Sequence, residues 1–344
     1  MRAVVTQEVG AMAVLDRPEP PDPGPGEVVV APEATGICGS DFHFFTGELS
    51  DAAGGSQFPR VQGHEAAARI VAVGPDCDER LAAGGRVALW PLRACGHCYP
   101  CSVGRGNACD NFSLIGIHSD GSLQNLLRIE ADHAFPIDVD DPAVAAMAEP
   151  VSIAVRAVQR GRIAARERVV VLGAGPIGQF VCLVARERGA EVLVVDLQER
   201  RLELSREMGA ETVAWTGADE VVAAARRWAG SAGPPVAVDA TGAPAAVRAM
   251  IDMVASAGRA VQVGMSLHDV GVRIGSLTEK ELDVLGVSCC GSTDFGEAVG
   301  VVQRNSELIA RMISHRFPLE RAPDALRFAI DNPAEVMKVV IQGE

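Results

Sequence analysis

The most telling part of this chain reads Val169-Val170-Val171-Leu172-Gly173-Ala174-Gly175-Pro176-Ile177-Gly178. Its four apolar residues predict a buried strand, the glycines form a Gly-x-Gly-x-x-Gly turn, and a helix is expected from Gln179 to Arg188. Gly173 permits the tight bend, Gly175 lets the backbone approach a pyrophosphate, and Gly178 allows close helix–strand packing. Ordinary turns also carry such glycines, so the prediction of a dinucleotide site depends on the next strand of the chain and the residue at its end.

That second strand pattern ends at Asp196, 18 residues after Gly178. A carboxylate at this place holds the ribose hydroxyls of a bound dinucleotide, and its charge repels the 2′-phosphate of NADP. We therefore expect a dinucleotide site with a preference for NAD. Arg200 and Arg201 stand close behind Asp196; they either neutralise such a phosphate or form a solvated helix start.

Three regions of the chain differ in pattern. Residues 1–147 hold short β-type runs broken by proline and glycine, which predicts an irregular barrel of short strands; the prolines between Pro18 and Gly26 require a loop. Residues 148–287 alternate strand, glycine-rich turn and helix, which predicts an α/β doubly wound parallel sheet. The tail, 288–344, ends in the strand-like run 335–341. We expect residues 1–147, completed by 288–344, to form one domain, and 148–287 a second.

The bulk composition suggests a soluble intracellular protein. The 344 residues suggest about two domains, and a formal charge of −14 argues against nucleic-acid or anionic-membrane partners. The first residues run directly into strand-like sequence and carry no signal-peptide pattern, and no apolar run reaches the length of a membrane span. We expect a cytoplasmic location. Cys182 lies in an apolar helical run and is expected to be a buried thiol.

Four cysteines stand close together as Cys-x2-Cys-x2-Cys-x7-Cys; they are Cys95, Cys98, Cys101 and Cys109. Four thiolates at this spacing can close a tetrahedral shell around one Zn²⁺ and leave no position for water. Disulfides or crowded free thiols are the alternatives, and disulfides are rare in intracellular proteins. We expect a structural zinc site that folds a lobe.

A third group of residues has the ligand types for a zinc with an open position. Cys38 lies in Gly36-Ile37-Cys38-Gly39-Ser40-Asp41-Phe42-His43, and His64 lies in Gly63-His64-Glu65. A zinc that keeps one water or alcohol ligand acts as a Lewis acid, and Ser40 and His43 could carry the released proton to solvent. A buried thiol and a hydrogen-bonded core histidine are the plain alternatives.

Taken together, these motifs resemble those of the zinc-dependent medium-chain alcohol and polyol dehydrogenases over essentially the whole chain. The resemblance also rests on Ala148-Glu149-Pro150 and Val238-Asp239-Ala240-Thr241-Gly242. It implies a GroES-like catalytic β-barrel domain and a Rossmann domain, two zinc ions per chain, and NAD as cofactor. Glu149 is typical of the sorbitol and threonine dehydrogenase branch, whereas ethanol-type enzymes have cysteine there.

In that branch the zinc ligands correspond to Cys38, His64 and Glu65, with Glu149 bound to the metal directly or through water. The proton relay maps onto Ser40 and His43. The cofactor contacts map onto Gly173, Gly175, Ile177, Gly178, Asp196, Arg201, Val263, Gly264, Met265, Val287 and Lys338, with Lys338 approaching the pyrophosphate. The resemblance therefore implies a complete set of catalytic residues.

The same resemblance suggests the substrate class. The stretches 96–101 and 114–121 look like those of bacterial galactonate- or idonate-type dehydrogenases, whereas Val287-Ser288-Cys289-Cys290 departs from sorbitol dehydrogenase. We expect oxidation of a secondary alcohol on a small polyol or sugar acid, with hydride transfer to NAD. Oxidation of L-threonine at its 3-hydroxyl is the alternative, although Ser40 stands where threonine dehydrogenases typically have threonine.

Two other kinds of protein share parts of this pattern. A zinc-stabilised NAD-binding module without turnover would need no open-sided metal, and a zinc-free quinone reductase would lack both metal motifs. Metal content separates these proteins. A dehydrogenase should bind two zinc ions per chain, a zinc-stabilised module one, and a quinone reductase none. For the dehydrogenase we expect a homo-oligomer, and a tetramer in preference to a dimer.

Overall fold

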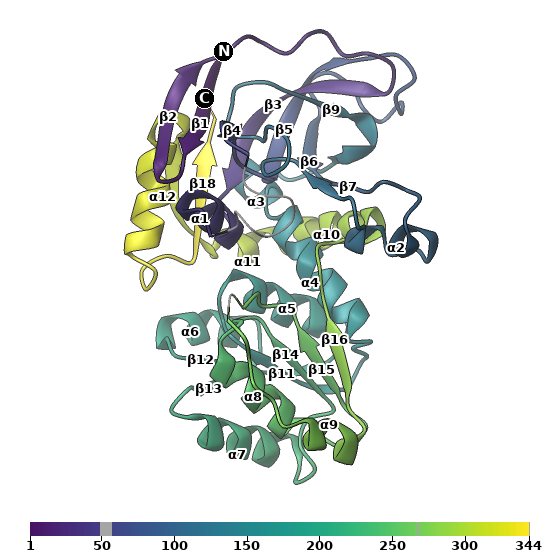
Figure 1. The fold of residues 1–344 in the computed structure, drawn as a ribbon, viewed down its shortest axis with the longest axis vertical. Coiled ribbons are helices and arrows are strands. Elements are labelled where there is room, and N and C mark those ends of the chain that lie inside the picture. Colours follow the sequence, from purple (N-terminus) through teal and green to yellow (C-terminus); the bar gives the residue numbers. More distant parts are fainter. Residues whose placement is uncertain (49–56, 267, 344) are drawn as a thin grey trace. The chain divides into compact units, whose positions relative to one another are not determined.

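The computed structural model describes residues 1–48, 57–266 and 268–343. The chain divides into two compact units (Figure 1): unit 1 contains Met1–Ser152 and Cys290–Glu344, and unit 2 contains Ile153–Cys289. The domain limits expected from the sequence, 147/148 and 287/288, lie a few residues before these divisions. The first division falls inside one continuous helix, α4 (Ala148–Arg160). The sequence pattern shows where this helix begins, but it does not show which of its residues pack in each unit.

Unit 1 is built mainly from short strands. They are β1 (Arg2–Glu8), β2 (Ala11–Asp16), β3 (Glu27–Gly36), β4 (Arg60–Val61), β5 (Glu65–Val73), β6 (Arg86–Leu89), β7 (Leu92–Arg93), β8 (Ser113–Leu114), β9 (Leu127–Glu130), β10 (Ala134–Pro136), β17 (Ile313–Pro318) and β18 (Lys338–Gln342). The largest sheet has the order β10-β6-β5-β3-β18-β17, and β9 also pairs with β3. The proline-rich loop is confirmed, since it connects β2 to β3.

Unit 1 also contains helices. They are α1 (Gly39–Thr46), α2 (Tyr99–Ser102), α3 (Pro142–Ala145), α10 (Ser292–Arg304), α11 (Ser306–Ala310) and α12 (Ala322–Asp331), with short 3-10 turns η1 (Gly106–Ala108), η2 (Ala131–His133) and η3 (Leu319–Arg321). Of these, α3 packs against β3 and β5, and α12 packs against β17 and β18. The final strand begins later than the expected run 335–341. The N–H groups of Glu335 and Val336 donate to the carbonyl of Asn332 and form a turn, so the strand starts at Lys338.

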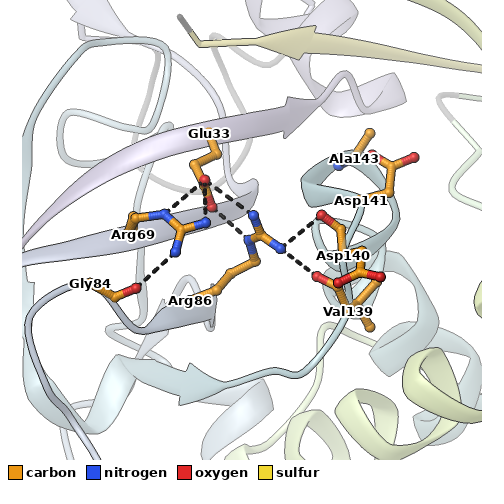
Figure 2. Close-up of polar contacts among 8 residues, drawn as sticks. All are labelled: Glu33, Arg69, Gly84, Arg86, Val139, Asp140, Asp141 and Ala143. Atoms are coloured by element: carbon orange, nitrogen blue, oxygen red, sulfur yellow. Dashed lines mark hydrogen bonds and ion pairs between the residues drawn. The ribbon is translucent and has the colours of Figure 1, made fainter.

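A cluster of charged residues joins three strands of unit 1 to the loop before α3. Figure 2 shows the carboxylate of Glu33 (β3) accepting from the guanidinium groups of Arg69 (β5) and Arg86 (β6). Arg86 Nη1 also donates to the carbonyls of Val139 and Asp140, at 2.5 and 2.9 Å. The guanidinium groups lower the pKa of Glu33 against the opposing effect of its partial burial. The cluster fixes the loop that leads into α3 and α4.

The described part of unit 2 contains one sheet of six parallel strands. They are β11 (Arg168–Leu172), β12 (Glu191–Asp196), β13 (Glu211–Ala214), β14 (Val236–Asp239), β15 (Arg259–Gln262) and β16 (Asp283–Gly286), in the order β13-β12-β11-β14-β15-β16. This is the strand order of a doubly wound dinucleotide-binding sheet. The sequence prediction of an α/β Rossmann-type unit is confirmed.

Helices lie on both faces of this sheet; they are α5 (Pro176–Glu187), α6 (Glu199–Glu207), α7 (Ala218–Ala229), α8 (Pro244–Met253) and α9 (Ile274–Lys280). Side chains of β11 alternate between the faces, and Val169 to Leu172 are all buried, so both faces are covered. The predicted helix 179–188 is wrong at its start. Pro176 occupies the first helical turn, where its missing N–H is not needed.

Within the described residues, no helix is both long enough and apolar enough to cross a bilayer.

Candidate active site

The four-cysteine lobe brings its sulfur atoms within reach of one metal ion. The Sγ atoms of Cys95, Cys98, Cys101 and Cys109 all lie within 4.8 Å of one another, with Cys98 at 3.4 Å from Cys101 and 3.6 Å from Cys109. A disulfide needs about 2.05 Å. A tetrahedral Zn–S shell with bonds of about 2.3 Å separates its sulfur atoms by roughly 3.8 Å. No disulfide joins these four cysteines, and their arrangement fits the one structural zinc ion that the spacing predicts.

Backbone N–H groups of the lobe point at two of the four sulfur atoms, those of Cys95 and Cys109. N–H groups of His97 and Cys98 lower the pKa of the Cys95 thiol to about 6. The N–H groups of Cys95 and Asn111 donate to Cys109 Sγ, at 3.2 and 3.3 Å. At Cys95 these bonds favour thiolate, the form that binds zinc, whereas burial and the neighbouring thiols raise the pKa of Cys101 to about 12.

A second group of ligand atoms forms where β3 ends and β5 begins. These strands pair antiparallel with Gly36 opposite Glu65, so Cys38 and His64, just beyond that pair, come together. Ligand atoms of Cys38, His64 and Glu65 lie within 4.8 Å of one another. A Cβ at position 36 would collide with the Glu65 carboxylate, which explains the glycine there. A thiol, an imidazole and a carboxylate form a ligand set for a zinc with an open position.

His64 is held in a buried and strongly polar setting. Its Nε2 lies 3.4 Å from Ser40 Oγ, and its Nδ1 is buried without a hydrogen-bond partner, 3.8 Å from Asp41 Oδ1. Burial opposes a charged imidazole, but the negative charge of Asp41 and the contact with Cys38 raise the pKa of His64 well above its usual value. The surroundings of His64 therefore already favour a positive charge at this place.

Lys338 lies beside the ligand group. Its ammonium forms an ion pair with Glu65 and donates to the carbonyl of Ile37 at 2.9 Å, and both charged side chains are almost fully buried. Burial alone would lower the pKa of Lys338, but Glu65, Cys38 and Glu149 together outweigh that effect and raise it. The sequence pointed to Lys338 as a contact of the pyrophosphate. The structure places it at the metal ligands, and its approach to the cofactor stays a prediction.

Glu149 lies in the first turn of α4 and is 8% exposed. Burial raises its pKa to about 7, and the nearby carboxylate of Glu65 acts in the same direction, against the charges of His64 and Lys338. Glu149 is close to the ligand group without belonging to the three atoms that lie within 4.8 Å. Its role as a further ligand, direct or through water, stays a prediction.

The two expected relay residues lie one turn apart on α1. Ser40 contacts the ligand His64, whereas His43 Nδ1 pairs with Glu48 Oε2 at 2.5 Å on the exposed side. Both side chains are described, and no hydrogen bond joins them directly. Both side chains are half-buried, and their role as a proton relay stays a prediction.

The glycine-rich turn of unit 2 has the geometry that a dinucleotide requires. Gly173 has a φ of +97°, and a Cβ on Gly178 would overlap the carbonyl oxygen of Gly173. A Cβ on Gly175 would meet nothing within 4 Å, so this position faces open space at the start of α5. Free N–H groups and the positive end of the helix dipole favour a phosphate there.

A cavity of about 340 Å³ adjoins this turn within unit 2. Its lining includes Gly173, Asp196, Arg201, Trp215 and Thr241. Asp196 ends β12, and its carboxylate accepts from the N–H groups of Ala174 at 2.6 Å and Gln198 at 2.8 Å. A fixed carboxylate beside a cavity with an aromatic wall fits the ribose and adenine of a dinucleotide. Trp215 gave no signal in the sequence, because it stands after β13 without a motif.

The remaining expected cofactor residues lie along neighbouring strand ends. The N–H groups of Val263 and Gly264 donate to the carbonyl of Asp239, and the N–H of Val287 donates to that of Gln262. Met265 is exposed, and Ile177 lies in the first turn of α5. All of these residues belong to unit 2, and their contacts with a cofactor stay predictions.

Comparisons with known proteins show the family of this chain. Residues 24–139 match the alcohol dehydrogenase GroES-like domain family, and residues 176–304 match the zinc-binding dehydrogenase family. L-galactonate-5-dehydrogenase from Escherichia coli K12 is 32% identical over 99% of this chain and 98% of its own. The chain belongs to the zinc-containing medium-chain alcohol dehydrogenases. As a member of this family it is an oxidoreductase that acts on a CH–OH group, in the branch of the sorbitol and galactonate dehydrogenases.

Solved structures of other family members cover the whole chain. A zinc-binding dehydrogenase from Sinorhizobium meliloti, bound to NADP, has a TM-score of 0.89 at 32% identity and covers 99% of this chain and 98% of its own. The alcohol dehydrogenase RspB from Escherichia coli CFT073, in complex with NADH, has a TM-score of 0.87 at 29% identity and covers 99% of both chains. The predicted GroES-like and Rossmann architecture is confirmed.

Proposed function

We propose that this protein oxidises a secondary alcohol group of a small polyol or sugar acid to a ketone, with NAD as hydride acceptor. The observation that carries the proposal is the group of Cys38, His64 and Glu65 in unit 1; unit 2 separately supplies a glycine-rich turn and Asp196. Relatives named as galactonate and altritol dehydrogenases support the substrate class.

We assign Cys38, His64 and Glu65 as the ligands of a catalytic zinc, with Glu149 beside it. When bound, zinc acts as a Lewis acid that lowers the pKa of an alcohol, and NAD accepts two electrons and one hydrogen as hydride. Ser40, which touches His64, accepts the hydroxyl proton as it releases its own, and the released proton reaches solvent by way of the half-buried His43. The alcohol carbon loses a hydride to NAD, the hydroxyl oxygen loses a proton to the relay, and the electron pair left on oxygen completes the carbonyl double bond.

The preference for NAD rests on Asp196. Its carboxylate stands at the cavity wall, where it accepts ribose hydroxyls and opposes a 2′-phosphate. The two structural relatives were solved with different dinucleotides, NADP and NADH, so family membership alone does not fix the choice and the proposal depends on Asp196. Arg201 lines the same cavity and is the residue that could weaken the preference.

We also propose that the protein is a homo-oligomer, and a tetramer in preference to a dimer. Support comes from β16, which lies at the edge of the unit 2 sheet and exposes 49% of Val284, with Ile274 64% exposed on the preceding helix. An open strand edge beside apolar side chains favours pairing with a second copy. Sedimentation or light scattering of the purified protein tests this. The cytoplasmic location expected from the sequence remains a prediction.

The experiment that tests the function combines zinc content with a substrate panel on one purified sample. Polyols, aldonates and L-threonine are each offered with NAD and with NADP, and formation of the reduced cofactor is followed by absorbance. We expect two zinc ions per chain and activity confined to polyols or aldonates with NAD. A single zinc ion per chain without turnover would favour the non-catalytic module, and activity with L-threonine alone would move the substrate to the amino-acid class.

A further inference from the structure

A buried chain of polar side chains leads away from the proposed catalytic zinc ligands. It runs from Thr6 in β1 through Gln62 to Asp41 in α1, and Asp41 faces His64. Thr6, Gln62 and Asp41 are each at most 1% exposed. The first two members are brought together only by the fold, since Thr6 and Gln62 lie 56 residues apart in the sequence. Side chains so far from water require a partner for every polar group.

The hydrogen bonds of this chain have a fixed direction. The Thr6 hydroxyl donates to Gln62 Oε1 at 2.5 Å, so Gln62 Nε2 must face the other way. There it donates to the backbone carbonyl of Asp41 at 3.1 Å and to its Oδ1 at 3.2 Å. Asp41 offers only acceptors at these atoms, and a flipped amide would set oxygen against oxygen. Thr6 therefore holds the amide of Gln62 with its donor toward Asp41.

Asp41 connects two of the proposed zinc ligands. Its Oδ2 accepts from the backbone N–H of Cys38 at 2.9 Å, and its Oδ1 lies 3.8 Å from the partnerless Nδ1 of His64. The donor from Gln62 reaches the same Oδ1. The hydrogen bond from Gln62 therefore fixes the rotation of the Asp41 carboxylate and the distance from its Oδ1 to His64 Nδ1.

We infer that Gln62, oriented by Thr6, is a positioning residue for the catalytic zinc of the proposed function. When the metal occupies one imidazole nitrogen, the other carries a hydrogen and needs an acceptor, which Asp41 Oδ1 supplies. Gln62 holds that acceptor in place while Asp41 also anchors the backbone of Cys38. The geometry of two ligands thus depends on an amide that touches neither of them. This inference rests on the assignment of Cys38, His64 and Glu65 as the zinc site.

The test measures zinc affinity separately from fold stability. Gln62→Met keeps the length of the side chain and removes the donor, and Thr6→Val keeps the shape and removes the hydroxyl. Thr6→Ser restores the hydroxyl. Ser205→Ala is the matched control, because the Ser205 hydroxyl donates to Oε1 of another fully buried glutamine, Gln179, in unit 2. Each zinc-loaded variant is equilibrated with increasing chelator, and the zinc per chain is measured. Replacement by Co²⁺ identifies the site lost, because a four-thiolate and a one-thiolate site absorb differently.

We expect Gln62→Met to weaken zinc binding at the one-thiolate site by about tenfold or more, the range of an outer partner of a metal ligand. Thr6→Val should weaken it by roughly fivefold, the effect of one neutral hydrogen bond. Thr6→Ser should restore wild-type affinity, and all variants should keep the four-thiolate zinc. Ser205→Ala should lower the unfolding temperature without changing zinc affinity.

Two results would overturn the inference. The first is wild-type zinc affinity in both Thr6→Val and Gln62→Met. The second is an equal loss of affinity in Ser205→Ala, which would mean that general destabilisation causes it. If Gln62→Met does not fold, the pair Thr6→Val and Thr6→Ser still decides. A wild-type protein that binds only the four-thiolate zinc would instead overturn the proposed metal centre itself.

Discussion

Lys338→Met removes the positive charge that faces Glu65, and its effect should depend on zinc. Lys338 is 4% exposed and Glu65 1%, so the variant leaves a carboxylate buried without its cation. Breaking such a pair costs about 3–5 kcal/mol of folding free energy. At about 2–4 °C per kcal/mol, the zinc-free variant should unfold roughly 6–20 °C below the wild type.

Zinc bound to Glu65 would replace the missing charge, so the zinc-loaded variant should lose much less stability. If the metal cancels about half of the cost, ~2 kcal/mol, the variant binds zinc about 30-fold more tightly than the wild type. Thermal unfolding with and without zinc, together with chelator competition, measures both quantities. We expect the zinc-free variant to unfold at a lower temperature than the zinc-free wild type, and the variant to bind zinc more tightly than the wild type.

Lys280→Met is the control for this experiment. The ammonium of Lys280 donates to the carbonyls of Ile251, Asp252 and Val254, at 3.0, 2.7 and 3.1 Å, at the end of α8 in unit 2. Its loss should destabilise the protein equally with and without zinc. If Lys338→Met behaves like Lys280→Met, or binds zinc more weakly than the wild type, then Lys338 is not the counter-ion that zinc displaces.

Four further changes test other parts of the structure. Cys101→Ser should lower the unfolding temperature while the remaining folded protein keeps most of its turnover, because the change opens the shell of a structural metal. Wild-type stability with lost turnover would contradict this. Asp196→Ala should raise the KM for NAD by about tenfold and narrow the NAD/NADP ratio, and an unchanged ratio would assign the choice to another residue. Glu149→Cys should retain zinc and lower kcat by one to three orders of magnitude, ~1.4–4 kcal/mol; full activity with full zinc would make Glu149 a bystander. The ion pair of Arg316 with Asp141 lowers the pKa of that carboxyl. Its contribution of ~0.5 kcal/mol is present above the unfolded pKa and is lost as pH falls below about 4, so Arg316→Gln should flatten the acid limb of the stability curve.

The features that could be predicted from the sequence are those whose parts lie close together along the chain. The four cysteines, the glycine turn and Asp196 each fall within short windows, where spacing alone restricts the geometry. The start of α5 was misplaced by three residues, because the apolar pattern outweighed the preference of Pro176 for a first turn.

The features that could not be predicted join distant strands. Lys338 donates to Ile37 across 301 positions, and no local pattern indicates that pair. A signal was nevertheless present, since Lys338 is the one charge within the apolar run from Val336 to Ile341, and a lysine in a buried strand requires a partner. Gln62 gave no comparable signal, because a glutamine beside a glycine is common in exposed turns.

The insertion of unit 2 into unit 1 has a consequence for the order of folding. The β18 strand pairs with β3, with Val340 opposite Gly36, and it is made long after its partner. Unit 2 is one continuous stretch and can complete its sheet while unit 1 still lacks β17 and β18. Contacts of such sequence separation form slowly. During synthesis Glu65 is therefore made long before Lys338, and the group of Cys38, His64 and Glu65 gains this neighbouring positive charge only when β18 joins the sheet.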